Sequence, residues 1–118
     1  MANTINNLAM ASTATLRITH QLRLMRDRRA DNQARLRILE RRLAGTAEAD
    51  TRANAELPIT FGRHASDWTK RHEAHYQRRL SELRLDARNE IGSIEKKIDR
   101  QSAAITAFHL KNASRGRE

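Results

Sequence analysis

The sequence contains no cysteine and no valine, and it has a single proline and four glycines. The absence of cysteine excludes disulfides and thiolate metal sites and leaves the compartment open. Strands joined by tight turns need Gly, Pro and β-branched residues, and the Ile, Thr and aromatic residues never alternate at a period of two. These absences predict an all-α protein built from long helices.

Aromatic residues are also scarce, at 3% of the chain, and hydrophobic residues make up only 38%. So little apolar material is thin for a globular core, but it suits a coiled coil, in which each helix buries one or two narrow stripes. No run approaches the roughly eighteen apolar residues that a membrane span requires. At 118 residues, the chain is predicted to form one domain.

The first 26 residues contain no acid and include several threonines and arginines and one serine. This composition is typical of a mitochondrial presequence, whereas a secretory signal would need a basic start followed by an unbroken apolar run. We expect a cytoplasmic protein, with a mitochondrial location as the alternative.

A heptad pattern runs through the first half of the chain. Apolar residues recur at alternating steps of three and four from Leu8 to Leu43, with a polar break at Arg29 and Asn32. Such spacing is typical of a coiled-coil seam, and polar residues within a seam usually fix its register or the number of helices. The pattern predicts a first helical arm over about residues 4–57.

Gly45 and Pro58 are the residues that can interrupt or end this arm. Glycine suits the left-handed residue that follows a helix end, but the residues after Gly45 are good helix formers, so we expect a bend there at most. The residue before proline is pushed out of the helical region. Pro58 is therefore predicted to end the arm and to open a turn over about residues 58–65.

The second arm is predicted over about residues 66–112, with Ser66 as its N-cap and Asp67 at the positive end of the helix. Its apolar stripe has two successive steps of four at Ala87, a stutter that locally unwinds a left-handed coiled coil. Residues 113–118 are polar and basic and are predicted to fray. Two such arms joined by one short turn should fold back as a long antiparallel helical hairpin.

Several apolar side chains lie off both stripes, namely Leu16, Leu24, Ile38 and Leu85. In a lone hairpin they would remain in water, which favours a second partner surface. The simplest arrangement that covers them is a homodimer packed as a four-helix bundle.

The chain carries 23 basic and 14 acidic residues, a net charge of +9, and such a field attracts polyanions. Arg28, Arg35 and Arg42 follow one another at intervals of seven beside the first seam. Guanidinium groups bind phosphate oxygens through two hydrogen bonds, so these residues are candidates for contacts with a nucleic-acid backbone. Alternatively, they are solvated charges that pair with acidic residues of the second arm, namely Glu82, Glu90 and Glu95.

A second basic cluster, which includes one tryptophan, begins within the predicted turn. Its candidate binding residues are Arg63, His64, Trp68, Lys70, Arg71, His72, His75, Arg78 and Arg79. Basic residues among aromatic ones can hold phosphates and stack on a base. In the alternative, Trp68 caps the end of the coiled coil and the charges are solvated. The histidines are expected at the surface, where they would gain charge near pH 6 and strengthen binding of an anionic partner.

No motif for catalysis or metal binding is present. His72 and His75 in HEAH are three residues apart, whereas the zinc-protease motif HExxH places its histidines four apart. There is no glycine-rich phosphate loop, no GxSxG and no paired carboxylate, and a helical hairpin lacks a concave site that excludes water. The sequence predicts a protein that is not an enzyme and has no cofactor.

Two functions fit these features. The first is a non-enzymatic basic coiled-coil protein that binds the phosphate backbone of nucleic acid without strong sequence specificity, since no helix-turn-helix spacing for reading bases appears. The alternative is a protein–protein scaffold, accessory or inhibitor factor of the phage type, which docks its basic face on an acidic protein partner. Retention on heparin and a salt-dependent shift of random-sequence DNA or RNA would distinguish the two.

Overall fold

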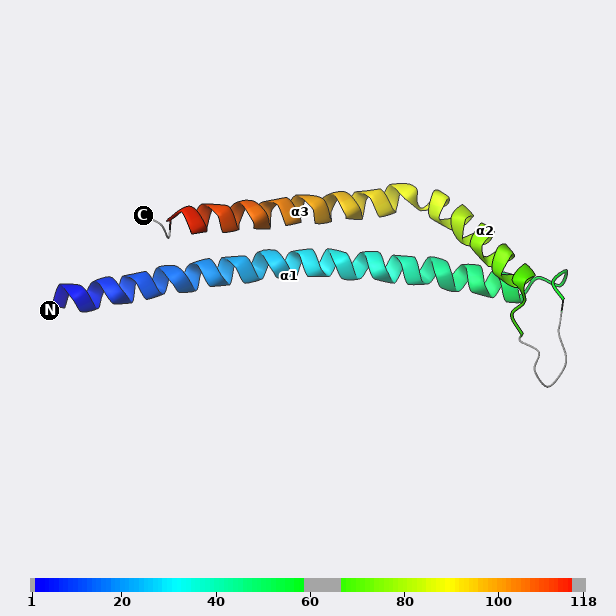
Figure 1. The fold of residues 1–118 in the computed structure, drawn as a ribbon, viewed down its shortest axis with the longest axis horizontal. Helices are drawn as coiled ribbons and strands as arrows, with labels where there is room; N and C mark the ends of the chain where they lie inside the picture. Colours follow the sequence, from blue (N-terminus) through cyan, green and yellow to red (C-terminus); the bar gives the residue numbers. More distant parts are fainter. Residues whose placement is uncertain (1, 59–66, 116–118) are drawn as a thin grey trace. The chain divides into compact units, whose positions relative to one another are not determined.

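The computed structural model describes residues 2–58 and 67–115, and among them the side chains of residues 13–58 and 67–113. Over this part of the chain it contains three α-helices and no strand: α1 (Ala2–Arg52), α2 (Lys70–Asp86) and α3 (Arg88–Arg115) (Figure 1). The all-α prediction is confirmed for the described residues.

Contacts divide the chain into two compact units. Unit 1 combines Met1–Ala34 with Glu95–Glu118, and unit 2 comprises Arg35–Ile94. Helix α1 contributes to both units, so its two halves face different partners: α3 in unit 1, and α2 with the start of α3 in unit 2. The assignment of the whole chain to a single domain stays a prediction.

The interior of unit 1 combines apolar burial with polar pairs. Ile105 of α3 is buried, and the two residues that interrupt the predicted seam both bond across to α3. Asn32 Nδ2 donates to Gln101 Oε1 at 3.0 Å, and Arg29 Nη1 donates to Ser102 Oγ at 3.3 Å. The partners follow in opposite order along the two helices, as an antiparallel pair requires. Each of these polar residues therefore has its hydrogen-bond partner only when α1 and α3 are aligned in this register.

Unit 2 also has a narrow core. Its buried residues are Leu39, Ala47, Thr51, His72, Ile91 and Ile94. Polar contacts between α1 and α2 join Arg84 Nη2 to Glu40 Oε1 at 3.6 Å, Arg79 Nε to Asp50 Oδ2 at 2.7 Å, and Thr51 Oγ1 to His75 Nδ1 at 2.8 Å. These partners too run in opposite order, so α1 and α2 pair antiparallel within this unit.

The predicted seam is buried or half-buried from Leu22 to Leu43, whereas Thr15 and Ile18 before it are exposed. Beyond Leu43 it shifts by one residue: the buried positions are Ala47 and Thr51, where steps of three and four had predicted Thr46 and Asp50. A straight α-helix has 3.6 residues per turn and lags behind a 3.5-residue repeat, so one additional residue after several heptads returns the seam to the same face. The residues predicted to lie off the stripes are exposed, namely Leu16, Leu24, Ile38 and Leu85.

Helix α1 ends at Arg52, before the predicted end at Leu57, and the cause is Asn54 rather than Pro58. The Asn54 side-chain Oδ1 accepts a hydrogen bond from the backbone N–H of Glu56 at 3.0 Å. The backbone N–H of Asn54 bonds to Thr51 O at 3.2 Å, a step of three in place of four. An asparagine that bonds to its own neighbouring backbone offers the chain a turn in place of a helix.

Helix α2 begins at Lys70, later than predicted, and its N-cap is Thr69. Thr69 has an extended backbone, and its Oγ1 accepts from the backbone N–H of His72 at 3.3 Å. In return, the Thr69 N–H donates to His72 Nδ1 at 3.1 Å. This is a capping box in which histidine takes the place of the usual Glu or Gln. The usual sequence signature, Ser or Thr followed three residues later by Glu or Gln, therefore does not reveal it. The predicted N-cap Ser66 lies outside the described residues, and Asp67 precedes the helix.

The second arm is not one helix, because Ala87 separates α2 from α3. Its backbone has φ −91° and ψ 6°, outside helical geometry, and its N–H bonds back to Leu83 O. The interruption falls on the predicted stutter. Two successive steps of four interrupt the alternating steps of three and four that an undistorted coiled coil requires. Here the helix accommodates the change by breaking at Ala87. At Gly45, by contrast, α1 continues, so glycine does not end the helix there.

The capping box predicts a measurable cost for losing the Thr69 hydroxyl. Thr69→Ala should lower the free energy of unfolding by about 1 kcal/mol, because one backbone N–H at the start of α2 loses its acceptor. Urea denaturation followed by circular dichroism measures the change. The matched variant Thr69→Ser keeps the hydroxyl and should retain most of the stability. Equal losses in both variants would contradict the role of the cap.

Candidate functional site

Three arginines predicted to contact phosphate lie on α1 with exposed side chains: Arg28, Arg35 and Arg42. None of the three side chains forms an ion pair or a hydrogen bond with another residue in the described part of the chain. Arg28 borders a shallow hollow of about 230 Å³ in unit 1, beside Met25.

The acidic residues expected to neutralise these arginines are engaged elsewhere or have no ion pair. Glu82 Oε2 pairs with Arg79 Nη1 of its own helix at 3.2 Å. Glu90 and Glu95 are in no ion pair within residues 13–58 and 67–113. The cross-helix ion pairs are instead Arg84 with Glu40 and Arg79 with Asp50. No ion pair joins Arg28, Arg35 or Arg42 to the predicted acidic partners among the described residues, and the alternative in which these arginines are only solvated charges stays a prediction.

The basic cluster after the turn is only partly assembled. Arg63 and His64 lie outside the described residues. Lys70, Arg71 and Arg78 are exposed on α2, and Arg71 and Arg78 border a hollow of about 260 Å³ that is also lined by Asn54 and Leu57.

Arg79 differs from its neighbours because it is already bonded within the chain. It contacts Asp50 and Glu82, and hydrogen bonds first to Asp50 and then to Glu82 raise the pKa of its guanidinium. A guanidinium held by two carboxylates has little charge left to offer a partner. Of the predicted cluster, Arg79 is therefore the weakest candidate for a contact with phosphate.

His72 and His75 do not lie freely at the surface as the sequence predicts. His72 is buried in the capping box of α2, and His75 is half-buried with Nδ1 bonded to Thr51 Oγ1. These side chains hold unit 2 together, and within the described residues no three groups of metal-ligating type come together around a common point.

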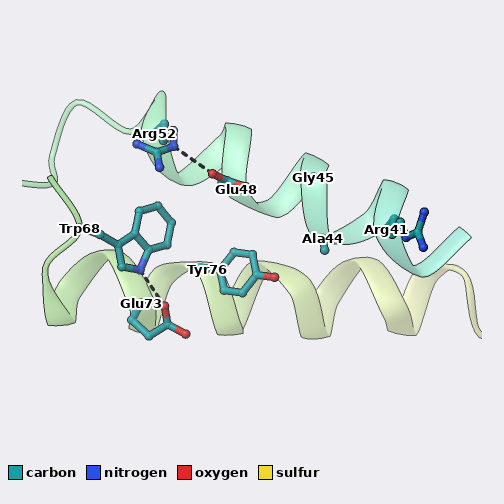
Figure 2. A pocket seen from close by; sticks show the side chains of 8 residues that line it. All are labelled: Arg41, Ala44, Gly45, Glu48, Arg52, Trp68, Glu73 and Tyr76. Carbon is teal, nitrogen blue, oxygen red and sulfur yellow. Dashed lines mark hydrogen bonds and ion pairs between the residues drawn. The ribbon is translucent and has the colours of Figure 1, made fainter. Parts of the chain in front are cut away.

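Trp68 and residues of α1 enclose a groove in unit 2 that the sequence does not reveal. The groove has a volume of about 460 Å³ and is lined from α1 by Arg41, Ala44, Gly45, Glu48 and Arg52, and from the other side by Trp68, Glu73 and Tyr76 (Figure 2). We refer to it as the Trp68 groove. It combines two aromatic rings, two arginines, two glutamates and the small residues Ala44 and Gly45 of α1.

The indole of Trp68 is held from several sides. Its Nε1–H donates to Glu73 Oε2 at 2.7 Å, and the Arg52 guanidinium lies 5.2 Å from the ring centroid. Tyr76 meets the indole nearly edge-on, with centroids 6.0 Å apart and planes inclined by 70°. Arg52 is itself fixed by Glu48, with Nε 3.2 Å from Oε1. Trp68 is half-buried by these contacts, and its predicted role in binding a partner stays a prediction.

Sequence analysis named Trp68 but not the other residues of the groove. Arg52 and Gly45 lie on the far side of the turn, so nothing in their spacing connects them with Trp68. From the sequence, Gly45 indicates at most a bend in the first arm. Only the pairing of α1 with α2 brings these residues together.

No family model matches this chain, and no curated protein or solved structure matches it. None of the helices in the described part of the chain has a segment both long and apolar enough to span a membrane.

The contact between Glu73 and Trp68 predicts a spectroscopic change in acid. Hydrogen bonds from Gln77 and then from Trp68 lower the pKa of Glu73 below its ordinary value of 4.5. The stabilisation from these bonds is complete above that ordinary pKa and is lost as the pH falls through the lower pKa of the folded protein. Because the chain has one tryptophan, its fluorescence should change with a midpoint below pH 4.5.

Glu73→Gln provides the control, since it removes the titrating group and should abolish this step. Circular dichroism at each pH separates local titration from unfolding. A fluorescence midpoint above 4.5, or a step that persists unchanged in Glu73→Gln, would contradict the assignment.

Proposed function

We propose that this protein binds the phosphate backbone of nucleic acid without strong sequence specificity and performs no catalysis. The observation that carries the proposal is the state of Arg28, Arg35 and Arg42, which are exposed on one helix and have no ion-pair partner among the described residues. Arginine forks bind phosphate oxygens in pairs of hydrogen bonds, and each contact releases counterions from the nucleic acid. Phosphate contacts read no sequence, which accounts for the expected lack of specificity.

The distribution of charge supports the same proposal. The chain has an excess of nine positive charges, and further exposed cations without ion-pair partners in the described chain lie on α2, namely Lys70, Arg71 and Arg78. The glutamates of the Trp68 groove are both engaged, Glu48 by Arg52 and Glu73 by Trp68. Neither is positioned as a free acid or base, which favours binding over catalysis.

The proposal predicts how the salt dependence of binding responds to loss of the three arginines. Changing Arg28, Arg35 and Arg42 together to Gln should weaken binding to random-sequence DNA or RNA and leave helicity unchanged. On duplex DNA, the slope of log K against log salt concentration should fall by about two to three units, since each phosphate contact contributes roughly 0.9. Fluorescence anisotropy at several salt concentrations measures both quantities.

A variant with the same loss of charge elsewhere controls for the general field of the protein. Lys96, Lys97 and Lys111 are exposed on α3, and their joint change to Gln removes three charges as well. Its salt slope should fall by less. Equal effects of the two triple variants would show that net charge alone drives binding, and an unaltered slope in the arginine variant would refute the proposed contacts.

Docking on a protein partner is the second candidate function, and the exposed apolar residues favour it. Leu16 and Leu110 in unit 1 are each 67% exposed, and Ile38 and Leu85 in unit 2 are 56% and 61% exposed. Large apolar side chains at such exposure are common where a partner surface covers them. A second copy of the chain is the simplest such partner, and packing of two hairpins as a four-helix bundle would cover them.

The homodimer predicts a mass of about twice 13.6 kDa by light scattering. Changing Leu16, Leu24 and Ile38 together to Gln should shift the protein toward the monomer, because the apolar surface that favours association is lost. Helicity by circular dichroism should persist in the variant, since all three side chains are exposed. A wild-type protein that remains monomeric at high micromolar concentration would rule out the dimer.

A further inference from the structure

Gly45 of α1 lines the Trp68 groove and leaves an open space there. Glycine in the middle of a helix is less stable than alanine by roughly 0.5–1 kcal/mol. A Cβ atom at Gly45 would meet nothing within 4 Å, so no neighbour among the described residues requires glycine there. With Ala44 beside it, Gly45 leaves open the surface that lies across the groove from Tyr76 (Figure 2).

The opposite side of the groove is an ordered aromatic wall. The bond from Trp68 Nε1 to Glu73 Oε2 fixes the plane of the indole, and Tyr76 abuts it edge-on. The guanidinium of Arg52, itself a flat group, already lies over the indole. Rings held in this way lose little freedom when a further planar group packs beside them.

Of the four charged side chains that line the groove, Arg41 alone has no bonded partner among the described residues. Arg52 is paired with Glu48, and Glu73 accepts from Trp68 and from Gln77 Nε2 at 2.9 Å. Arg41, by contrast, lines the groove with an exposed side chain and has no ion pair within the described residues. A ligand that suits the groove therefore combines a flat ring with an adjacent anion.

We propose that the Trp68 groove receives an unpaired base of single-stranded nucleic acid, with Arg41 on the neighbouring phosphate. A groove of about 460 Å³ is within the range of small-ligand sites, roughly 300–1,000 Å³. Stacking on aromatic side chains is sequence-tolerant, because every base has a π-face. Bases in a duplex keep their faces stacked inside it, so the groove distinguishes single strands from duplexes. This inference rests on the proposed nucleic-acid binding and adds a preferred form of the ligand.

The test places a larger side chain at Gly45 and compares the binding of single-stranded and duplex nucleic acid. Gly45→Leu adds a large side chain to a residue that lines the groove and whose Cβ would meet nothing within 4 Å, and Gly45→Ala is the matched control that makes a comparable gain in helix propensity with one methyl group. Labelled oligothymidylate and a random-sequence duplex serve as probes in anisotropy titrations at low salt. Gly45→Leu should weaken oligothymidylate binding by about tenfold, the effect of losing one stacked base, and should leave duplex binding and the Gly45→Ala affinities near wild type.

Tryptophan fluorescence gives a readout that needs no variant. The single tryptophan lies in the groove, so oligothymidylate should quench or shift its emission at saturation, while the duplex should not. Equal affinities of Gly45→Leu and wild type for oligothymidylate, or an emission unchanged by bound oligothymidylate, would overturn the inference while leaving phosphate binding intact. Failure of the wild type to bind either probe would overturn the proposed function and the inference with it.

Discussion

The pairing of α1 with its partner helices depends on polar side chains as much as on apolar ones. The contact between the helices is not apolar throughout, since Asn32 bonds to Gln101 and Thr51 bonds to His75. Among the described residues, no buried side-chain nitrogen or oxygen lacks a partner. Such pairs contribute little net stability, but a slipped register would leave them unsatisfied, so they select one alignment of the helices.

Side-chain hydrogen bonds also determine where the helices of unit 2 end and begin. Asn54 ends α1 and Thr69 caps α2, so the helix ends are determined by local hydrogen bonds. Arg52, in the last turn of α1, then lies against Trp68, just ahead of α2. These two residues close one end of the groove, and Gly45 leaves its α1 side open. The site we propose for a base is thus a consequence of where the two helices stop.

Few charged side chains of the described residues pair across helices, and most of the arginines are exposed. The cross-helix ion pairs use Glu40 and Asp50 to hold Arg84 and Arg79. Since acids are fewer than bases by nine, most arginines remain exposed to solvent. Both proposals, phosphate contacts along α1 and a phosphate beside Arg41, draw on that surplus. Exposed apolar residues such as Leu16 and Leu85 do not contribute to this charge and suit contact with a protein partner.

The sequence by itself determined the helical class, the seam from Leu22 to Leu43, the polar break at Arg29 and Asn32, and the stutter at Ala87, because each follows from local propensity or helical periodicity. It also identified Arg28, Arg35 and Arg42 as exposed. Tertiary structure alone decided the break between α2 and α3, the seam beyond Leu43, the burial of His72 in an unusual cap and the existence of the groove. Gly45 and Arg52 lie on α1 and Tyr76 lies on α2, so their place in one groove depends on the alignment of the two helices. That alignment arises from cross-helix bonds that no single segment of the sequence contains.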